Sequence, residues 1–358
     1  MKPTQELHDL GQSLWLDNIT RTMLDDGTLK GYIDELSVTG QTSNPTIFDK
    51  AIGGGDSYDE QITELREKGL DGEDLFFELA LTDILRAAKL FEPTHKETDG
   101  VDGFVSLEVS PLLAYDTAKT IQQAADLHGR AADNVFIKIP GTPEGLPAIE
   151  ESIFAGVPIN VTLLFSADQY EAAADAFMKG IERRIEADLD PNVTSVASLF
   201  ISRWDVAVHD DVPDDVKNTL GVAVGKRTYK AYRDLLHSDR WKGLADQGAK
   251  PQRLLFASTG TKDPEASDTL YIEAFAAPDT INTMPDKTLH AFADHGKVGD
   301  PLPDDGGDWE QALKANQDAG VDTDALALHL QKEGADAFVK SWTDLLETIK
   351  SESERLVA

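Results

Sequence analysis

The sequence contains no cysteine in its 358 residues. This absence excludes disulfide bonds, a thiol nucleophile and metal sites built from cysteine. No apolar run approaches the length of about eighteen residues that a membrane-spanning helix requires. The N-terminal segment Met1–His8 also lacks the apolar core of a secretory signal. Together these absences predict a cytoplasmic protein that does not cross a membrane.

Basic residues are scarce, with 33 lysines and arginines against 65 aspartates and glutamates, which gives a formal net charge of −32. A surface of this sign repels nucleic acid and anionic membranes, so neither is expected as a partner. The acidic residues are spread along the chain, for example in the pairs Asp210-Asp211 and Asp304-Asp305. Two explanations are open: an ordinary solvated surface, or adaptation to high salt, where screening relieves the repulsion between carboxylates.

The length exceeds that of most single domains, but α/β barrels often run this long as one domain. Strand-like segments alternate with longer helical patterns, which predicts a parallel sheet of βα units. Residues 1–358 are therefore expected to form a single (β/α)8 TIM barrel, an α/β fold, with additional helices. The eight segments expected as strands are Leu14–Ile19, Ser37–Asn44, Gly103–Pro111, Val135–Gly141, Pro158–Phe165, Ser195–Trp204, Arg253–Thr259 and Tyr271–Ala276.

Between these strands, helical spacing of apolar residues predicts helices. Asp168 and Asp214 are expected in the acidic first turns that helix dipoles favour. The four segments with this pattern are Leu75–Phe91, Tyr115–Ala132, Ala167–Ala187 and Asp214–Leu236.

The last segment, Asp324–Ala358, also has apolar residues at helical spacing. They are Phe338, Trp342, Leu345 and Ile349. This stripe predicts an amphipathic helix packed on the barrel, and a helix that binds a partner is the alternative.

Lys138 stands alone in the otherwise apolar run Val135–Gly141. A buried ammonium group is costly to desolvate, and that cost favours the neutral amine, the nucleophile that forms a Schiff base with a carbonyl. The alternative is a lysine on an edge strand, with its stem on apolar surface and its head in water.

Polar side chains recur with the same parity in several expected strands, where they alternate with aliphatic residues. They are Asp17, Ser106, Glu108, Lys138, Asn160 and Thr162. One such residue is more often structural than catalytic. A whole set needs partners that an apolar core cannot offer, so it indicates a polar site inside the barrel. Barrel enzymes place their chemistry at the C-terminal ends of the strands.

The residues of this set lie in motifs that resemble those of transaldolases, which are class I Schiff-base enzymes of the pentose phosphate pathway. The resemblance runs from Leu7 to about Lys262. Its motifs, in the family's order, are Thr42–Phe48 (TSNPTIF), Ser106–Val109 (SLEV), Phe136–Pro140 (FIKIP) and Ile159–Phe165 (INVTLLF).

The resemblance implies a role for each catalytic position. Lys138 corresponds to the Schiff-base lysine, and Asp17 to the acid/base that acts on the hydroxyl at C4 of the sugar. Glu108 and Thr162 correspond to the pair that holds a proton-shuttling water.

Further positions correspond to substrate ligands of the family. Asn44, Asn160 and Ser198 correspond to groups that bind the hydroxyls of the dihydroxyacetone unit. At Phe200 the chain resembles transaldolases, whereas the related aldolases carry tyrosine.

The phosphate ligands are implied in the same way. Arg203 corresponds to a phosphate ligand, a role that suits its planar fork of donors. The next element departs from the family's pattern, which often reads Ser-Phe-Arg. Here Ser258 is followed by Thr-Gly-Thr-Lys262, so Lys262 has to supply the second positive charge.

The implied function is transfer of a dihydroxyacetone unit from sedoheptulose 7-phosphate or fructose 6-phosphate to glyceraldehyde 3-phosphate or erythrose 4-phosphate. Two alternatives are an aldolase-like lyase, which releases free dihydroxyacetone, and a silent barrel that only binds sugar phosphates. No cofactor is needed, because an iminium on a lysine is itself an electron sink. A monomer and a homodimer are both open.

The competing hypothesis is a metal site at His290, Asp294 and His295. The two histidines do not have the i, i+4 spacing that places a pair on one helical face. No metal is therefore expected.

Overall fold

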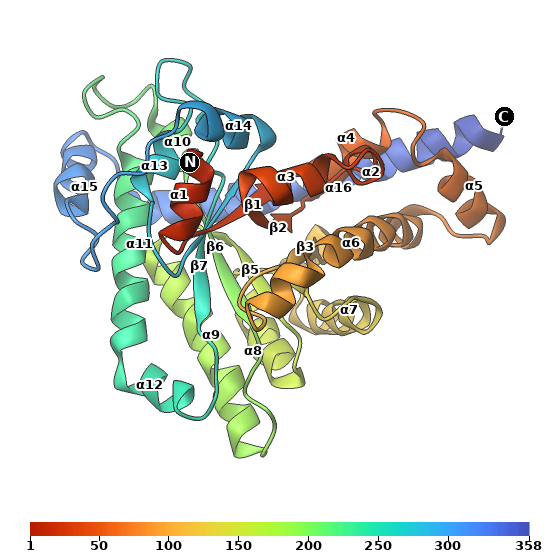
Figure 1. The fold of residues 1–358 in the computed structure, drawn as a ribbon, viewed down its shortest axis with the longest axis horizontal. Helices are drawn as coiled ribbons and strands as arrows, with labels where there is room; N and C mark the ends of the chain where they lie inside the picture. The colour runs from red at the N-terminus through yellow and green to blue at the C-terminus, as the bar shows by residue number, and fades with distance from the viewer. Residues whose placement is uncertain (358) are drawn as a thin grey trace.

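The computed structural model describes residues 1–357, which form a closed barrel of eight parallel strands (Figure 1). Each strand pairs with the next along the chain, and the last pairs with the first. This confirms the predicted (β/α)8 fold. The strands are β1 (Ser13–Asp17), β2 (Val38–Thr42), β3 (Val105–Glu108), β4 (Val135–Pro140), β5 (Ile159–Leu164), β6 (Ser195–Phe200), β7 (Gln252–Ala257) and β8 (Ile281–Met284).

Helices surround the barrel, and within residues 1–357 none is long and apolar enough to span a membrane. One short 3₁₀ helix, η1, covers Pro111–Leu113. The α-helices are α1 (Pro3–Asp9), α2 (Arg21–Asp25), α3 (Thr28–Leu36), α4 (Pro45–Ile52), α5 (Asp59–Glu67), α6 (Gly72–Glu97), α7 (Thr117–Arg130), α8 (Gly145–Ala155), α9 (Ala167–Glu186), α10 (Ser202–Val208), α11 (Leu220–His237), α12 (Asp239–Ala245), α13 (Leu270–Ala274), α14 (Asp286–His295), α15 (Trp309–Asp318) and α16 (Thr323–Val357).

Aromatic rings fill the barrel interior below the polar residues. The ring centroids of Phe104 and Phe136 are 4.1 Å apart, and those of Trp15 and Phe136 are 6.2 Å apart. Trp15 and Phe136 stand two residues before Asp17 and Lys138, so alternation along the strand places them on the same face. The inner face of the barrel thus has an apolar layer directly below the polar residues at the strand ends.

The eighth strand is not where the sequence predicted it. Tyr271–Ala276, expected as a strand, overlaps helix α13, and β8 is Ile281–Met284. This strand has only four residues, and two of them are the polar Asn282 and Thr283. Its two apolar residues, Ile281 and Met284, are three positions apart, so the segment lacks the alternation that is clear in β3.

One predicted helix start is also wrong. The segment from Asp214 was expected to be helical, but α11 begins at Leu220. Asp214 lies in the preceding turn and pairs with Lys217 at 2.8 Å. The carboxylate that serves the start of α11 is Asp205 of α10, whose Oδ1 accepts the backbone N–H groups of Leu220 and Gly221. Asp168 does lie in the first turn of α9, as predicted.

The C-terminal helix α16 is packed on the barrel as expected, with the predicted apolar stripe of Phe338, Trp342, Leu345 and Ile349 buried. In Figure 1 it runs along the long axis of the molecule. Gln331 ties it to the barrel, because its Nε2 donates to the carbonyl oxygens of Gly141 and Leu163 at 2.9 and 3.0 Å. These carbonyls lie at the ends of β4 and β5, so α16 passes over the C-terminal mouth.

Candidate active site

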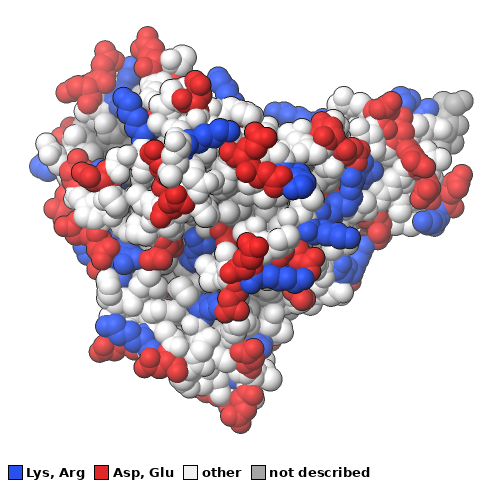
Figure 2. All heavy atoms as spheres, viewed as in Figure 1, with Lys and Arg blue, Asp and Glu red and all other residues white. Residues whose placement is uncertain are grey.

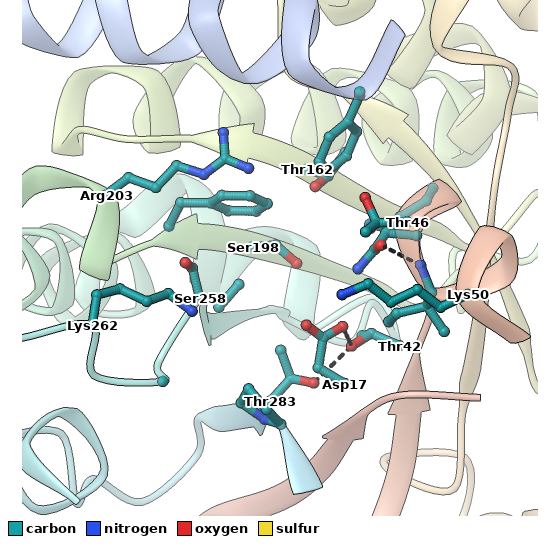
Figure 3. Close-up of a pocket in the computed structure, with 18 residues that line it drawn as sticks. Asp17, Thr42, Thr46, Lys50, Thr162, Ser198, Arg203, Ser258, Lys262 and Thr283 are labelled. Atoms are coloured by element: carbon teal, nitrogen blue, oxygen red, sulfur yellow. Dashed lines mark hydrogen bonds between the residues drawn. The ribbon is translucent and has the colours of Figure 1, made fainter. Parts of the chain in front are cut away.

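A cavity of about 340 Å³ opens at the C-terminal mouth of the barrel (Figure 3). Most of the residues predicted for the site line it: Asp17, Asn44, Lys138, Thr162, Ser198, Phe200, Arg203, Ser258 and Lys262. The other two, Glu108 and Asn160, each donate to or accept from a residue of this lining. The chain therefore brings together all the residues that the sequence singled out.

Lys138 is buried on β4, with 5% of its surface exposed. Its Nζ donates to Glu108 Oε2 at 3.0 Å and to the carbonyl oxygen of Ser43 at 3.0 Å. The pair with Glu108 follows from the strand register, in which the two residues stand opposite each other on β3 and β4. An edge-strand lysine with its head in water is thereby excluded.

The second oxygen of Glu108 has no partner in the part of the chain that is described. Glu108 Oε1 and Thr162 Oγ1 are both buried and both lack a hydrogen bond within the protein. Burial raises the pKa of Glu108, and the ammonium group of Lys138 opposes the shift. A carboxyl with a raised pKa beside an amine is suited to exchange protons with it.

Asp17 ends β1 and faces the cavity without a direct bond to Lys138. Thr42 donates its hydroxyl to Asp17 Oδ1 at 2.8 Å, and the hydroxyl oxygens of Thr42 and Thr283 are 2.7 Å apart. Burial raises the pKa of Asp17, and the charge of Lys138 opposes this. The sequence analysis missed both threonines, although Thr42 begins one of the family motifs.

Amide and hydroxyl groups lie near Lys138, some on the cavity wall and some behind it. Ser198 donates its hydroxyl to Asn160 Oδ1 at 2.7 Å, and Asn160 Nδ2 donates to Ser106 Oγ at 3.0 Å. Asn44 lies past the end of β2, where its Oδ1 accepts the backbone N–H of Ile47 and caps α4. Its amide group therefore has a fixed orientation.

Arg203 and Lys262 lie together at one end of the cavity, and Lys50 extends into it from α4 (Figure 3). Neither Lys50 nor Phe338 was predicted as a site residue. The Phe338 ring of α16 is 5.7 Å from Lys138 Nζ and 5.9 Å from the guanidinium carbon of Arg203. Only the fold shows that α16 contributes to the site.

The charge of this lining is opposite to that of the whole chain. Lys50, Lys138, Arg203 and Lys262 face a single carboxylate, that of Asp17, on a protein with a net charge of −32. Local excess of positive charge in a cleft attracts an anionic ligand. Arg203 supplies the planar donors that match phosphate oxygens.

The histidines of the metal hypothesis have separate partners. His290 Nε2 is 2.9 Å from the Tyr32 hydroxyl, whereas His295 lies 2.9 Å from Asp268 and 3.3 Å from Asp294. In residues 1–357, no group of three or more histidine, aspartate or glutamate side chains is placed to hold a metal ion.

Comparison with known proteins agrees with this geometry. The family model for transaldolase/fructose-6-phosphate aldolase matches residues 14–349. The chain belongs to this family. The matched region contains β2 to β8, all of β1 except its first residue, Ser13, and most of α16.

Relatives from several bacteria match over nearly their whole length. A transaldolase of Arthrobacter sp. strain FB24 is 43% identical over 97% of this chain and 96% of its own. A transaldolase of Thermobifida fusca is 43% identical over 97% of both chains. Transaldolase 2 of Streptomyces coelicolor is 40% identical over 98% of this chain and 97% of its own.

Proposed function

We propose that the protein is a transaldolase, which moves a dihydroxyacetone unit from a ketose phosphate to an aldose phosphate. The donors are sedoheptulose 7-phosphate or fructose 6-phosphate, and the acceptors are glyceraldehyde 3-phosphate or erythrose 4-phosphate. The observation that carries the proposal is the buried Lys138, which is bonded to Glu108 and lies in a cationic cavity lined by a second carboxyl group, that of Asp17.

Imine formation begins when the amine of Lys138 attacks the ketone carbon of the donor. Glu108 first accepts a proton from the ammonium group and then returns one to the carbinolamine oxygen, which leaves as water. The 3.0 Å contact between these two side chains suits this exchange. The free Glu108 Oε1 and Thr162 Oγ1 are suited to hold the water that relays the proton.

Carbon–carbon cleavage then uses Asp17. Its carboxylate takes the proton of the C4 hydroxyl, the C3–C4 bond breaks, and the electron pair moves into the iminium to give an enamine. The aldose phosphate leaves with the new aldehyde group. The enamine carbon attacks the aldehyde of the acceptor, whose oxygen takes the proton back from Asp17 as the new C3–C4 bond forms. Hydrolysis of the new iminium then releases the product and regenerates Lys138.

The remaining residues bind the substrate. Asn44, Asn160 and Ser198 hold the hydroxyls of the dihydroxyacetone unit, and Arg203, Ser258 and Lys262 hold the phosphate. Lys262 takes the place of the arginine that is frequent in the family.

A lyase that releases free dihydroxyacetone is the second candidate, since the family model covers aldolases as well. Phe200 favours the transferase. Its ring lines the cavity and offers no proton to the enamine, which therefore survives until an acceptor arrives.

Reduction with borohydride in the presence of fructose 6-phosphate tests the proposal. We expect a stable adduct on Lys138, identified by peptide mapping, and transfer to erythrose 4-phosphate in the absence of the reductant. Lys138→Arg should form no adduct at position 138 and should not transfer the unit, because a guanidinium stays protonated and cannot act as the nucleophile. Substantial turnover by Lys138→Arg, or an adduct on another lysine, would contradict the mechanism.

A further inference from the structure

Arg203 is held in the cavity by packing alone. Within residues 1–357, no hydrogen bond or ion pair reaches its guanidinium group, whose carbon lies 5.3 Å from the Phe200 ring and 5.9 Å from the Phe338 ring. Burial lowers the pKa of Arg203, and the charge of Glu333 on α16 opposes this. An arginine without bonded partners keeps all its N–H donors for a ligand, but its position then depends on its neighbours.

Gly334 of α16 is another of these neighbours. A Cβ atom added at this position would lie 3.1 Å from Nη1 of Arg203 and 3.0 Å from Cδ2 of Leu163. Gly334 is buried in the helix and does not have a positive φ angle. Glycine inside a helix is less favourable than alanine, so its backbone conformation gives no reason for it. The close approach of Leu163 and Arg203 does give a reason, and of these two side chains only Arg203 belongs to the cavity lining.

Gly334 and Phe338 are one helical turn apart and therefore share a face of α16. Gly334 leaves room for the guanidinium group, and Phe338 covers it with a ring. Phe200 of β6 provides the second ring. In Figure 3 the helix passes above Arg203, whose side chain extends along the cavity.

We propose that Gly334 is a positioning residue for substrate phosphate: by lacking a side chain it lets Arg203 lie under α16 with its donors directed into the cavity. The inference deepens the proposed function and rests on it. It makes α16 part of the selection for phosphorylated substrates, although no side chain of Gly334 touches the substrate.

The test compares Gly334→Ala with the wild type. Each protein is measured with two ketone probes, one that carries a phosphate group and one that does not. Adduct formation on Lys138 is measured in borohydride with fructose 6-phosphate and with dihydroxyacetone. The half-saturating concentration of fructose 6-phosphate should rise on the order of tenfold, because Arg203 is displaced. That of dihydroxyacetone should not change. Gly129→Ala is the matched control, since a Cβ atom there meets nothing within 4 Å and both values should stay as in the wild type.

A purely structural role predicts a different pattern. Equal losses with both probes, or no change with either, would overturn the inference. A double-mutant cycle adds a second criterion, because Gly334→Ala should have no further effect once Arg203→Ala has removed the guanidinium group. A further loss in that background would mean that the effect of Gly334 does not pass through Arg203. If Gly334→Ala does not fold, it is combined with Leu163→Ala, which removes the other atom that the added Cβ would meet, and the same comparison is made against Leu163→Ala alone.

Binding of inorganic phosphate, measured by calorimetry, tests the inference independently of the proposed function. We expect phosphate binding to require Arg203 but no Schiff base. A wild-type protein that forms no adduct with either probe would refute the proposed function. Weaker phosphate binding by Gly334→Ala would still support the inference, and unchanged binding would refute it.

Discussion

Asp17 is half-buried and Glu108 is buried, and desolvation raises the pKa of both carboxyl groups, but their contacts differ. Glu108 is bonded directly to Lys138, whereas Asp17 is bonded to Thr42. This difference divides the proton transfers between them. Glu108 is placed to serve the amine and Asp17 to serve a group further along the substrate.

The activity of the variant Asp17→Asn tests whether Asp17 acts in carbon–carbon cleavage and not in formation of the imine. An asparagine keeps the size of the side chain and an oxygen that accepts from Thr42, but it cannot take up the C4 proton. We expect the borohydride adduct on Lys138 to form, while transfer to the acceptor falls by a factor on the order of a hundred or more. Loss of both steps to the same extent would show that Asp17 acts before cleavage.

The same variant should be more stable than the wild type at neutral pH. Burial raises the pKa of Asp17 in the folded protein above its ordinary value of 3.8, so ionisation of this group opposes folding. In the wild type, the protonated Asp17 carries no such penalty below its ordinary pKa. The folded protein loses stability as pH rises through the raised pKa and the group ionises. Urea unfolding should therefore show a gain for Asp17→Asn near pH 7.5 that disappears toward pH 3.8. The exposed control Asp210→Asn should show no such pH-dependent gain.

Phe200 decides the fate of the enamine in the proposed mechanism. A tyrosine hydroxyl at this position could order a water or relay a proton to the enamine carbon, which would end the reaction as free dihydroxyacetone. We expect Phe200→Tyr to raise the ratio of released dihydroxyacetone to transferred product, measured with and without an acceptor. An unchanged ratio would mean that Phe200 does not separate the transferase from the lyase.

Helix α16 is anchored at the ends of two adjacent strands of the barrel. Its residue Gln331 donates to two carbonyl oxygens at the ends of β4 and β5, one of them on Leu163. Leu163 has a φ angle of +59°, which is unfavourable for a residue with a branched side chain. The hydrogen bond from Gln331 stabilises this local conformation next to Thr162.

Loss of this anchor should destabilise the protein. Gln331→Ala removes the donor from two buried carbonyl groups, which should lower the free energy of unfolding by about 1–3 kcal/mol. The matched control is Gln247→Ala, because Gln247 also donates to a backbone carbonyl, that of Gly243, but on the exposed surface. Urea unfolding of the two variants gives the comparison, and equal changes in both would contradict an anchoring role.

The sequence predicts best those elements whose pattern is local. Seven strands and the parity of Lys138 and Glu108 follow from alternation within single segments. Strand β8 does not, because its two apolar residues are three positions apart and show no alternation. Phe338 was correctly predicted to be buried, yet its place above Lys138 depends on how α16 packs against the barrel. Long-range packing of this kind leaves no mark in a single sequence.

The molecule as a whole carries its excess negative charge over its surface. Figure 2 shows acidic side chains across the visible face, with basic ones interspersed. Many basic residues are already in exposed pairs one helical turn apart, such as Lys340 with Asp344 and Lys314 with Asp318. Such pairs contribute little individually, so the repulsion among the remaining carboxylates dominates the response to salt.

The melting temperature should therefore rise as potassium chloride increases from dilute to molar, because screening removes this repulsion. Combined substitution of Asp210→Asn, Asp211→Asn and Asp215→Asn should reduce the slope of melting temperature against salt concentration. It makes the net charge of −32 less negative and removes no ion pair of the described residues. The control, Lys340→Gln with Asp344→Asn, removes one pair and leaves the net charge unchanged, so its slope should equal that of the wild type. A melting temperature that stays constant or falls with salt would contradict salt adaptation and would favour an ordinary solvated acidic surface.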